Sequence, residues 1–240
     1  EISIGGNLWM KSAATRIFSG RRWFSTHPAP GEEALSVHGT RVWQGSDSLG
    51  TFRATTVELA AGATPLLTTA RVYNTATGGA AAAVVFEQSA PAGVNGANYA
   101  WSCGADFENC TSTRGRAAPS PTAPVISFPA LDVESGQSER LDWLTWFGTQ
   151  INSATGRGLS TLPKHVLGLS GGPIAAFEPG GWAAVLSPAA DLSVRLSTSH
   201  IEKEPGNSSL SFGISSELES LPAGFTTQTV MVVGRGLTET

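Results

Sequence analysis

The segment Gly168-Leu169-Ser170-Gly171-Gly172 has the Gly-x-Ser-x-Gly spacing of the nucleophile elbow of serine hydrolases. That motif exposes its serine only where a strand turns sharply into a helix. Here Pro173 follows and a strand-like pattern resumes, with no alternation of strands and helices around it. We therefore interpret the segment as a glycine-rich turn between strands. A serine hydrolase using Ser170 would also require a histidine within hydrogen-bond reach of the hydroxyl.

The other residues that could do chemistry do not group. The histidines are His27, His38, His165 and His200. None has metal-ligand spacing to another histidine, a cysteine or a carboxylate. The acidic pairs are Glu32 with Glu33, Asp132 with Glu134, and Glu217 with Glu219. Such pairs cleave glycosides only when they converge in a cleft, and each fits a solvated turn or strand face better. The sequence predicts no catalytic residue, metal or cofactor.

Two cysteines, Cys103 and Cys110, enclose a short polar loop. A metal site would need more ligands than Asp106 and Glu108, and the spacing is not that of a Cys-x-x-Cys redox pair. We expect a disulfide that closes this loop, as is usual in secreted chains; two free buried thiols are the alternative.

Asn109-Cys-Thr and Asn207-Ser-Ser match the acceptor pattern for N-glycosylation. Asn207 follows Glu204-Pro-Gly206, which is a turn pattern, and Asn109 lies in the cysteine loop, so both are expected to be exposed. The chain also begins at Glu1 rather than Met, and it stops at Thr240 soon after an expected strand. These features together predict a processed piece of a secreted protein, extracellular or lumenal in location.

The composition favours an all-β fold. The 240 residues are 40% hydrophobic and only 14% charged, with 28 Gly and 14 Pro, which suits many short strands joined by turns. The net charge of −4 and the absence of a basic cluster predict no nucleic-acid partner. No apolar run is long enough to predict a membrane span.

Alternating patterns predict the strands. Residues 35–43, 51–59, 66–73 and 83–88 form an expected antiparallel meander, in which Phe52 and Ala54 face one way and Arg53 and Thr55 the other. Residues 173–178 and 182–187 form a hairpin around Pro179-Gly-Gly, and further strands are expected at 141–147, 192–199, 209–218 and 225–233. Half-buried antiparallel strands need a second sheet to cover them. The prediction is a single large β-sandwich domain over 1–240, with an irregular segment at 1–34 and the cysteine loop and a Pro-rich crossover at 91–124.

Seven tryptophans are the main enrichment, and exposed indoles bind sugars. Trp43, Trp143 and Trp182 lie in apolar-periodic strands and are expected in the core. Trp146 should point opposite to Trp143, and Trp101 lies beside the cysteine loop. Trp101 and Trp146 are therefore the candidates for a glycan or interface contact.

Four stretches carry a resemblance: 171–177 (GGPIAAF), 184–188 (AVLSP), 218–225 (LESLPAGF) and 232–236 (VGRG with its preceding Val). Together they resemble the N-terminal region of large eukaryotic secreted proteins in which a β-sandwich precedes a (β/α)8 barrel. The barrel is of glycoside-hydrolase type, as in the α-galactosidase/raffinose-synthase-like and related clans. The resemblance implies that the catalytic carboxylates belong to the barrel, so that no catalytic residue is carried over to this chain.

The resemblance leads to a hypothesis of function. The chain would be a non-catalytic accessory β-sandwich that braces a downstream catalytic domain or a second polypeptide, with the loops at 101–111 and 143–148 near the substrate cleft. The alternatives are a free-standing, lectin-like glycan-binding module and an extracellular structural or assembly subunit. A broad apolar interface would favour the last of these.

Overall fold

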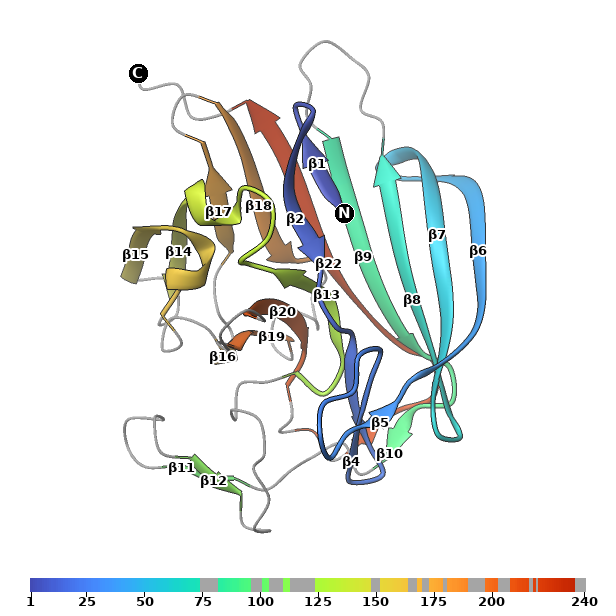
Figure 1. Cartoon of the computed structure of the whole chain (residues 1–240). Coiled ribbons are helices and arrows are strands. Elements are labelled where there is room, and N and C mark those ends of the chain that lie inside the picture. The colour runs from blue at the N-terminus through green and yellow to red at the C-terminus, as the bar shows by residue number, and fades with distance from the viewer. Residues whose placement is uncertain are drawn as a thin grey trace.

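The computed structural model describes most of the chain. The described residues are 1–73, 82–95, 101–103, 110–112, 124–147, 152–163, 168–169, 173–178, 181–189, 197–202, 208–215, 218 and 220–235. Within them there is no α-helix, and the only helical segments are the 3₁₀ turns η1 (Ser138–Arg140) and η2 (Leu159–Thr161). The predicted all-β class, a large antiparallel β-sandwich, is confirmed (Figure 1).

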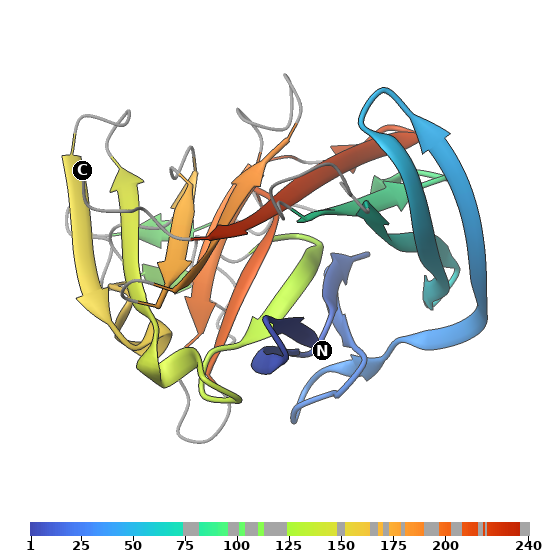
Figure 2. The ribbon, with the colours of Figure 1, turned by 90° about the horizontal axis from the view of Figure 1, so that it is seen from above.

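A nine-stranded antiparallel sheet forms one layer, in the order β15-β14-β17-β18-β22-β9-β8-β7-β6. Its strands are β6 (Ser36–Asp47), β7 (Gly50–Ala61), β8 (Thr64–Tyr73), β9 (Ala82–Ala90), β14 (Asp142–Phe147), β15 (Asn152–Arg157), β17 (Ile174–Phe177), β18 (Trp182–Pro188) and β22 (Phe225–Arg235). The expected meander is β6 to β9, and the expected hairpin is β17 with β18. Viewed from above, this sheet curves, and β6 and β15 lie at its opposite ends (Figure 2).

A six-stranded sheet forms the facing layer, in the order β1-β2-β13-β20-β19-β16. Its strands are β1 (Ile2–Ile4), β2 (Asn7–Ser12), β13 (Ser127–Asp132), β16 (Gly168–Leu169), β19 (Ser197–Glu202) and β20 (Ser209–Ile214). The smaller sheets are β3 (Arg16–Ser19) with β4 (Arg22–Ser25) and β5 (Glu33–Ala34), β10 (Val94–Asn95) with β21 (Ser220–Leu221), and β11 (Trp101–Cys103) with β12 (Cys110–Ser112).

The expectation of an irregular segment at 1–34 is wrong, because β1 to β5 lie there. Two-residue turns reverse the chain twice: Gly5-Gly6 joins β1 to β2, and Gly20-Arg21 joins β3 to β4. All four turn residues have positive φ, as the tight hairpin turns that match strand twist require. The strands on either side are too short to produce a clear alternation in the sequence.

The main core lies between the two large sheets. It is centred on the fully buried Trp9, Met10, Leu186 and Phe212, which come from both layers. A second core, containing Ile17, Phe24, Leu59 and Leu66 among others, lies beneath β3 to β5. Leu59 lies on the inner face of β7, opposite the side taken by Phe52, so β7 is buried on a different face at each of its ends.

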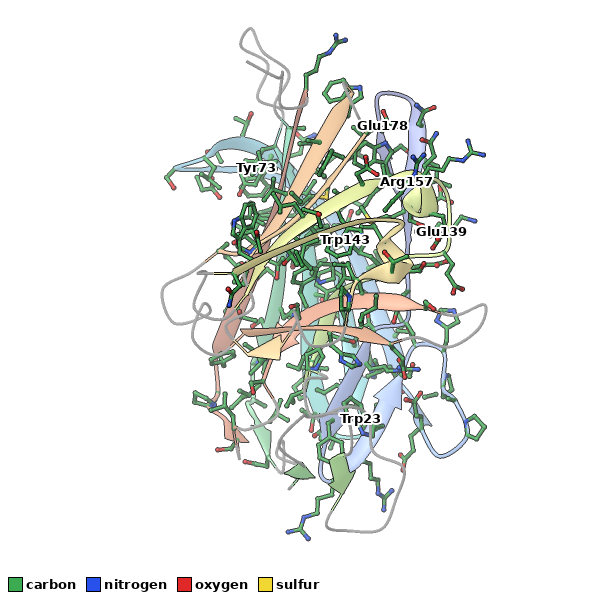
Figure 3. All side chains as sticks on the ribbon, turned by 90° about the vertical axis from the view of Figure 1, so that its left-hand side faces the viewer. Trp23, Tyr73, Glu139, Trp143, Arg157 and Glu178 are labelled. Carbon is green, nitrogen blue, oxygen red and sulfur yellow. The ribbon has the colours of Figure 1, made fainter. Side chains whose placement is uncertain are left out.

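Trp143 shows how the core constrains the sheet. Its ring lies in the interior of the molecule (Figure 3), and its indole N–H donates to Thr161 Oγ1 at 2.9 Å. The ring covers Gly156, its partner on β15, so closely that a Cβ there would lie 2.4 Å from the ring. Leu141, Trp143 and Thr145 share the buried face of this segment, so Trp143 lies in the core as predicted.

Candidate functional site

A cavity of about 640 Å³ lies between the two sheets. Its lining is mainly apolar and comes from both layers: Ile2, Ile4, Ala70, Val72, Ala82, Val84, Phe86, Phe128, Pro129, Ala130, Leu131, Trp182, Met231 and Val233, with Glu1, Ser3, Gly5, Ser12 and Thr15. The volume falls within the roughly 300–1,000 Å³ of small-molecule sites.

The wall on the nine-stranded sheet follows from strand alternation. Val84 and Phe86 point inward from β9, and the register places them opposite Met231 and Thr229 of β22. On the other side of β9, Ala70 lies opposite Phe86. Because alternate side chains of neighbouring strands share a face, these residues form one continuous apolar surface.

The opposite wall comes from β1 and β13, where Ile2, Ile4, Phe128 and Leu131 face the cavity. The ring of Phe128 meets that of Phe86 edge to face, with 5.8 Å between centroids. This contact joins the two walls and closes part of one side of the space. Gln88, two residues further along β9, donates from its side-chain nitrogen to the carbonyl oxygens of Phe128 and Phe212 and so holds the sheets together.

Trp182 also lines the cavity, from the start of β18. Its indole packs on the β1–β2 turn, where a Cβ on Gly5 would lie 2.3 Å from the indole nitrogen. The guanidinium of Arg235 stands 5.5 Å from the ring centroid, a cation–π arrangement. Trp182 is therefore half-buried rather than in the core, which corrects the prediction for this residue.

Hydroxyl groups and Glu1 provide the polar part of the lining. Ser12 ends β2, Thr15 lies in the connection toward β3, and Ser3 lies on β1. Val72, at one side of the lining, is 50% exposed, and Arg53 and Thr55 next to it on the same inner face of the sheet are exposed as well. The site is therefore an apolar space with hydroxyls in its lining and a continuing sheet face beside it.

An aromatic and charged cluster lies on the other face of β6, β7 and β8. The rings of Trp43 and Phe52 meet edge to face at 5.2 Å, and those of Phe52 and Tyr73 lie 5.3 Å apart. Trp43 is half-buried here, so the prediction that it lies in the main core is wrong. Gly45 makes the packing possible, since a Cβ there would lie 2.7 Å from the Phe52 ring.

Charged groups close this cluster. Asp47 accepts hydrogen bonds from the Tyr73 hydroxyl at 2.6 Å and from Arg71 at 3.1 Å. Arg71 also pairs with Glu87 at 2.9 Å and lies over the Phe52 ring. Burial, followed by the hydrogen bond to Asp47, raises the pKa of Tyr73 to about 12. The same bond lowers the pKa of Asp47, so at neutral pH the carboxyl of Asp47 is ionised and the hydroxyl of Tyr73 keeps its proton.

The sequence-predicted site residues do not converge. Ser170, Asn109 and Asn207 lie outside the described residues, as do His165, Glu217 and Glu219. His27 and His38 are exposed, whereas His200 is buried. In the described ranges, no group of three or more His, Cys, Asp or Glu residues is placed to hold a metal ion.

The cysteine hairpin is described by its backbone. β11 and β12 pair antiparallel, with Cys103 directly opposite Cys110 and Trp101 opposite Ser112. Trp146 is half-buried on β14, on the side of the strand away from Trp143, as the alternation predicts. No residue of the cavity was identified from the sequence, because its walls join segments as distant as Ile2 and Val233.

The fold and cavity define the class: an antiparallel β-sandwich with an apolar space between its sheets. No protein-family model matches the chain. No curated protein matches it either. In the part of the chain that the structure describes, no helix has the length and apolar character to cross a membrane. The resemblance to sandwiches of glycoside-hydrolase-type proteins therefore stays a prediction.

Proposed function

We propose that this chain is a non-catalytic binding β-sandwich whose inter-sheet cavity holds an elongated, largely apolar small molecule. One observation carries the proposal: the cavity of about 640 Å³ is lined from both sheets by aliphatic and aromatic side chains. An apolar surface of this kind is costly to leave in water, at roughly 25 cal/mol per Å². An apolar ligand removes that surface from water without requiring the sheets to move.

The lining also sets the shape of the ligand. The side chains along one wall run from Ala82 to Phe86, four residue steps of β9, or about 13 Å at about 3.3 Å each. The hydroxyls of Ser3, Ser12 and Thr15 offer hydrogen bonds, and the lining also includes Glu1, whose side chain can carry a negative charge. The ligand that fits is therefore elongated, has a group that hydrogen-bonds to the hydroxyls, and carries no negative charge beside Glu1.

Fluorescence of anilinonaphthalene sulfonate, an apolar-site probe, tests this proposal with two variants of adjacent residues. Val84→Phe places a ring inside the cavity, whereas Ala83→Leu enlarges a side chain on the opposite face of the same strand. We expect the wild type and Ala83→Leu to bind one probe molecule. We expect Val84→Phe to bind the probe at least about tenfold more weakly, since its ring fills the space.

Circular dichroism of each variant separates loss of the site from loss of the fold. Equal probe binding by a folded Val84→Phe would contradict the proposal, as would saturation at many sites on the wild type. Displacement of the probe by neutral long-chain alcohols, and not by free sugars, is the expected second result.

The wider setting follows from the sequence predictions. We propose that the module belongs to a secreted protein, with a disulfide between Cys103 and Cys110 and glycans on Asn109 and Asn207. In support, the backbone pairs the two cysteines directly across a hairpin, where Cα atoms lie about 4.5–5.5 Å apart, within the range that a disulfide spans. Thiol alkylation without reductant should modify neither cysteine, and glycosidase treatment of the protein from its source should lower its mass.

The accessory role beside a glycosidase barrel or a second polypeptide remains part of the proposal. Co-purification of that partner on a native gel tests it. A glycan-binding role is the second candidate, because Trp146 stands half-buried on the face away from the core. Trp146→Ala would then abolish binding to a glycan array, while leaving probe binding in the cavity unchanged.

A further inference from the structure

Strand β6 ends the nine-stranded sheet, and no strand among the described residues pairs with its outer edge. It is twelve residues long, from Ser36 to Asp47, and Figure 1 shows it at the margin of the molecule. A free edge presents a row of unpaired backbone N–H and C=O groups that can accept another strand. Long edges of this kind are usually protected by lysine, proline or a covering element, and β6 contains neither residue.

Exposed apolar side chains concentrate at this edge. Val37 and Val42 on β6 are 62% and 55% exposed, and Leu49 in the adjoining turn is 60% exposed. These are the three most exposed large hydrophobic residues in the described part of the chain. Their position at the edge indicates a surface that another chain covers.

The sequence of β6 is complementary to itself. Two copies of one strand pair antiparallel about a two-fold axis perpendicular to the sheet, which places each residue opposite one on the same face. With the axis at Val42, this residue lies opposite the partner's Val42. Arg41 lies opposite the partner's Trp43, and the two-fold symmetry produces this contact twice. Thr40 then faces the partner's Gln44, which is a hydrogen-bonding pair.

Neighbouring registers are less favourable. An axis at Arg41 sets two guanidinium groups against each other, and like charges directly opposite are destabilising. An axis at Trp43 or Gln44 leaves Val42 opposite a polar side chain. The register centred on Val42 pairs the regular part of β6 from Gly39 to Gly45, beyond the bulge between Val37 and Gly39. It also repeats a contact already present within the chain, where Arg41 lies 5.6 Å from the Trp43 ring centroid.

We propose that β6 pairs antiparallel with β6 of a second copy of this chain, with the two-fold axis at Val42, so that the two nine-stranded sheets form one continuous sheet. The interface is separate from the cavity, so the dimer and the ligand site are independent properties. The partner that fits is this same chain, because the complementary residues on both sides are its own.

Sedimentation over a wide concentration range tests the association. We expect the wild type to reach twice the 24.8 kDa of the chain. Val42→Lys sets two ammonium groups against each other at the axis and should leave only monomer. Val232→Lys is the matched control, since Val232 is 44% exposed on the central strand β22 and far from any edge. This control should remain dimeric.

A cross-link tests the register. In a background with both native cysteines changed to serine, Val42→Cys should form a disulfide-linked dimer on mild oxidation, because residues directly opposite in antiparallel strands lie within disulfide range. Val232→Cys should not form it. The proposal is overturned by a wild type that stays monomeric at every concentration, by a dimer that persists in Val42→Lys, or by equal cross-linking of the two cysteine variants.

Discussion

The hydroxyl of Tyr73 provides a direct test of the cluster on the outer face of β6 to β8. The side chain is 2% exposed, and its O–H donates to Asp47 at 2.6 Å. Burial is the largest cause of the raised pKa, the hydrogen bond to Asp47 is the second, and the nearby Arg71 opposes both. The resulting pKa of about 12 lies two units above the ordinary value of 10.0.

The chain has only two tyrosines, so Tyr99→Phe leaves Tyr73 as the single phenol. Its ultraviolet phenolate absorbance should then rise with a midpoint near pH 12. Between pH 10 and 12 the folded state keeps a proton that the unfolded state loses. The contribution to stability is therefore complete below pH 10 and is lost as the pH rises to 12. Two units correspond to at most about 3 kcal/mol in the free energy of unfolding, and solvent screening reduces this figure.

Asp47→Asn removes the negative charge opposite the phenol and should lower the pKa of Tyr73 toward 10. The amide oxygen still accepts the hydrogen bond, so the fold should persist. A Tyr73 midpoint near pH 10 in the Tyr99→Phe protein, with native circular dichroism, would refute the reasoning. The lowered pKa of Asp47 has the opposite sign: its contribution is complete at neutral pH and is lost as acid protonates it below about pH 4.

The core allows two further predictions, both measured by urea unfolding. Gly156→Ala places a methyl group against the Trp143 ring and should lower the free energy of unfolding by about 1–3 kcal/mol. Gly234→Ala is the control and should lower it by less than about 1 kcal/mol, because no atom lies within 4 Å of a Cβ at that position. Equal losses in the two variants would contradict the packing. Gln88→Leu removes the side-chain donor from the carbonyl groups of Phe128 and Phe212 and should cost about 1–3 kcal/mol for each. Gln228→Leu removes a single bond, to Glu87, and should cost clearly less; the reverse order would exclude a bridging role for Gln88.

The alternating residue patterns predicted most of the strands in the fold. Phe52 and Ala54 alternate with Arg53 and Thr55 as predicted, because one face of β7 is buried at that end and the other is not. The strand expected at 141–147 is β14 (Asp142–Phe147), and the buried side chains of this segment follow a period of two. The short turns between these segments also predicted which strands of the meander are neighbours, since consecutive antiparallel strands usually pair.

Local patterns missed what depends on distant segments. The strands of 1–34 depend on pairing with β13 and on contacts with the second core, and the short apolar patterns at 8–10 and 17–18, which lie in β2 and β3, do not identify these distant partners. Trp182 was expected in the core from its strand pattern, yet it lines the cavity, because the facing layer at that point is the β1–β2 turn.

By itself, the sequence determined the all-β class, most strand positions and the apolar side of strands such as the start of β7 and β14, because alternation and turn residues act over a few neighbouring positions. The tertiary structure decided the rest. The cavity exists because side chains of β8, β9 and β22 face those of β1 and β13 across the sandwich, and β6 is the last strand of the nine-stranded sheet among the described residues because the meander begins there. Both are properties of how separate segments meet, and no local pattern encodes that meeting.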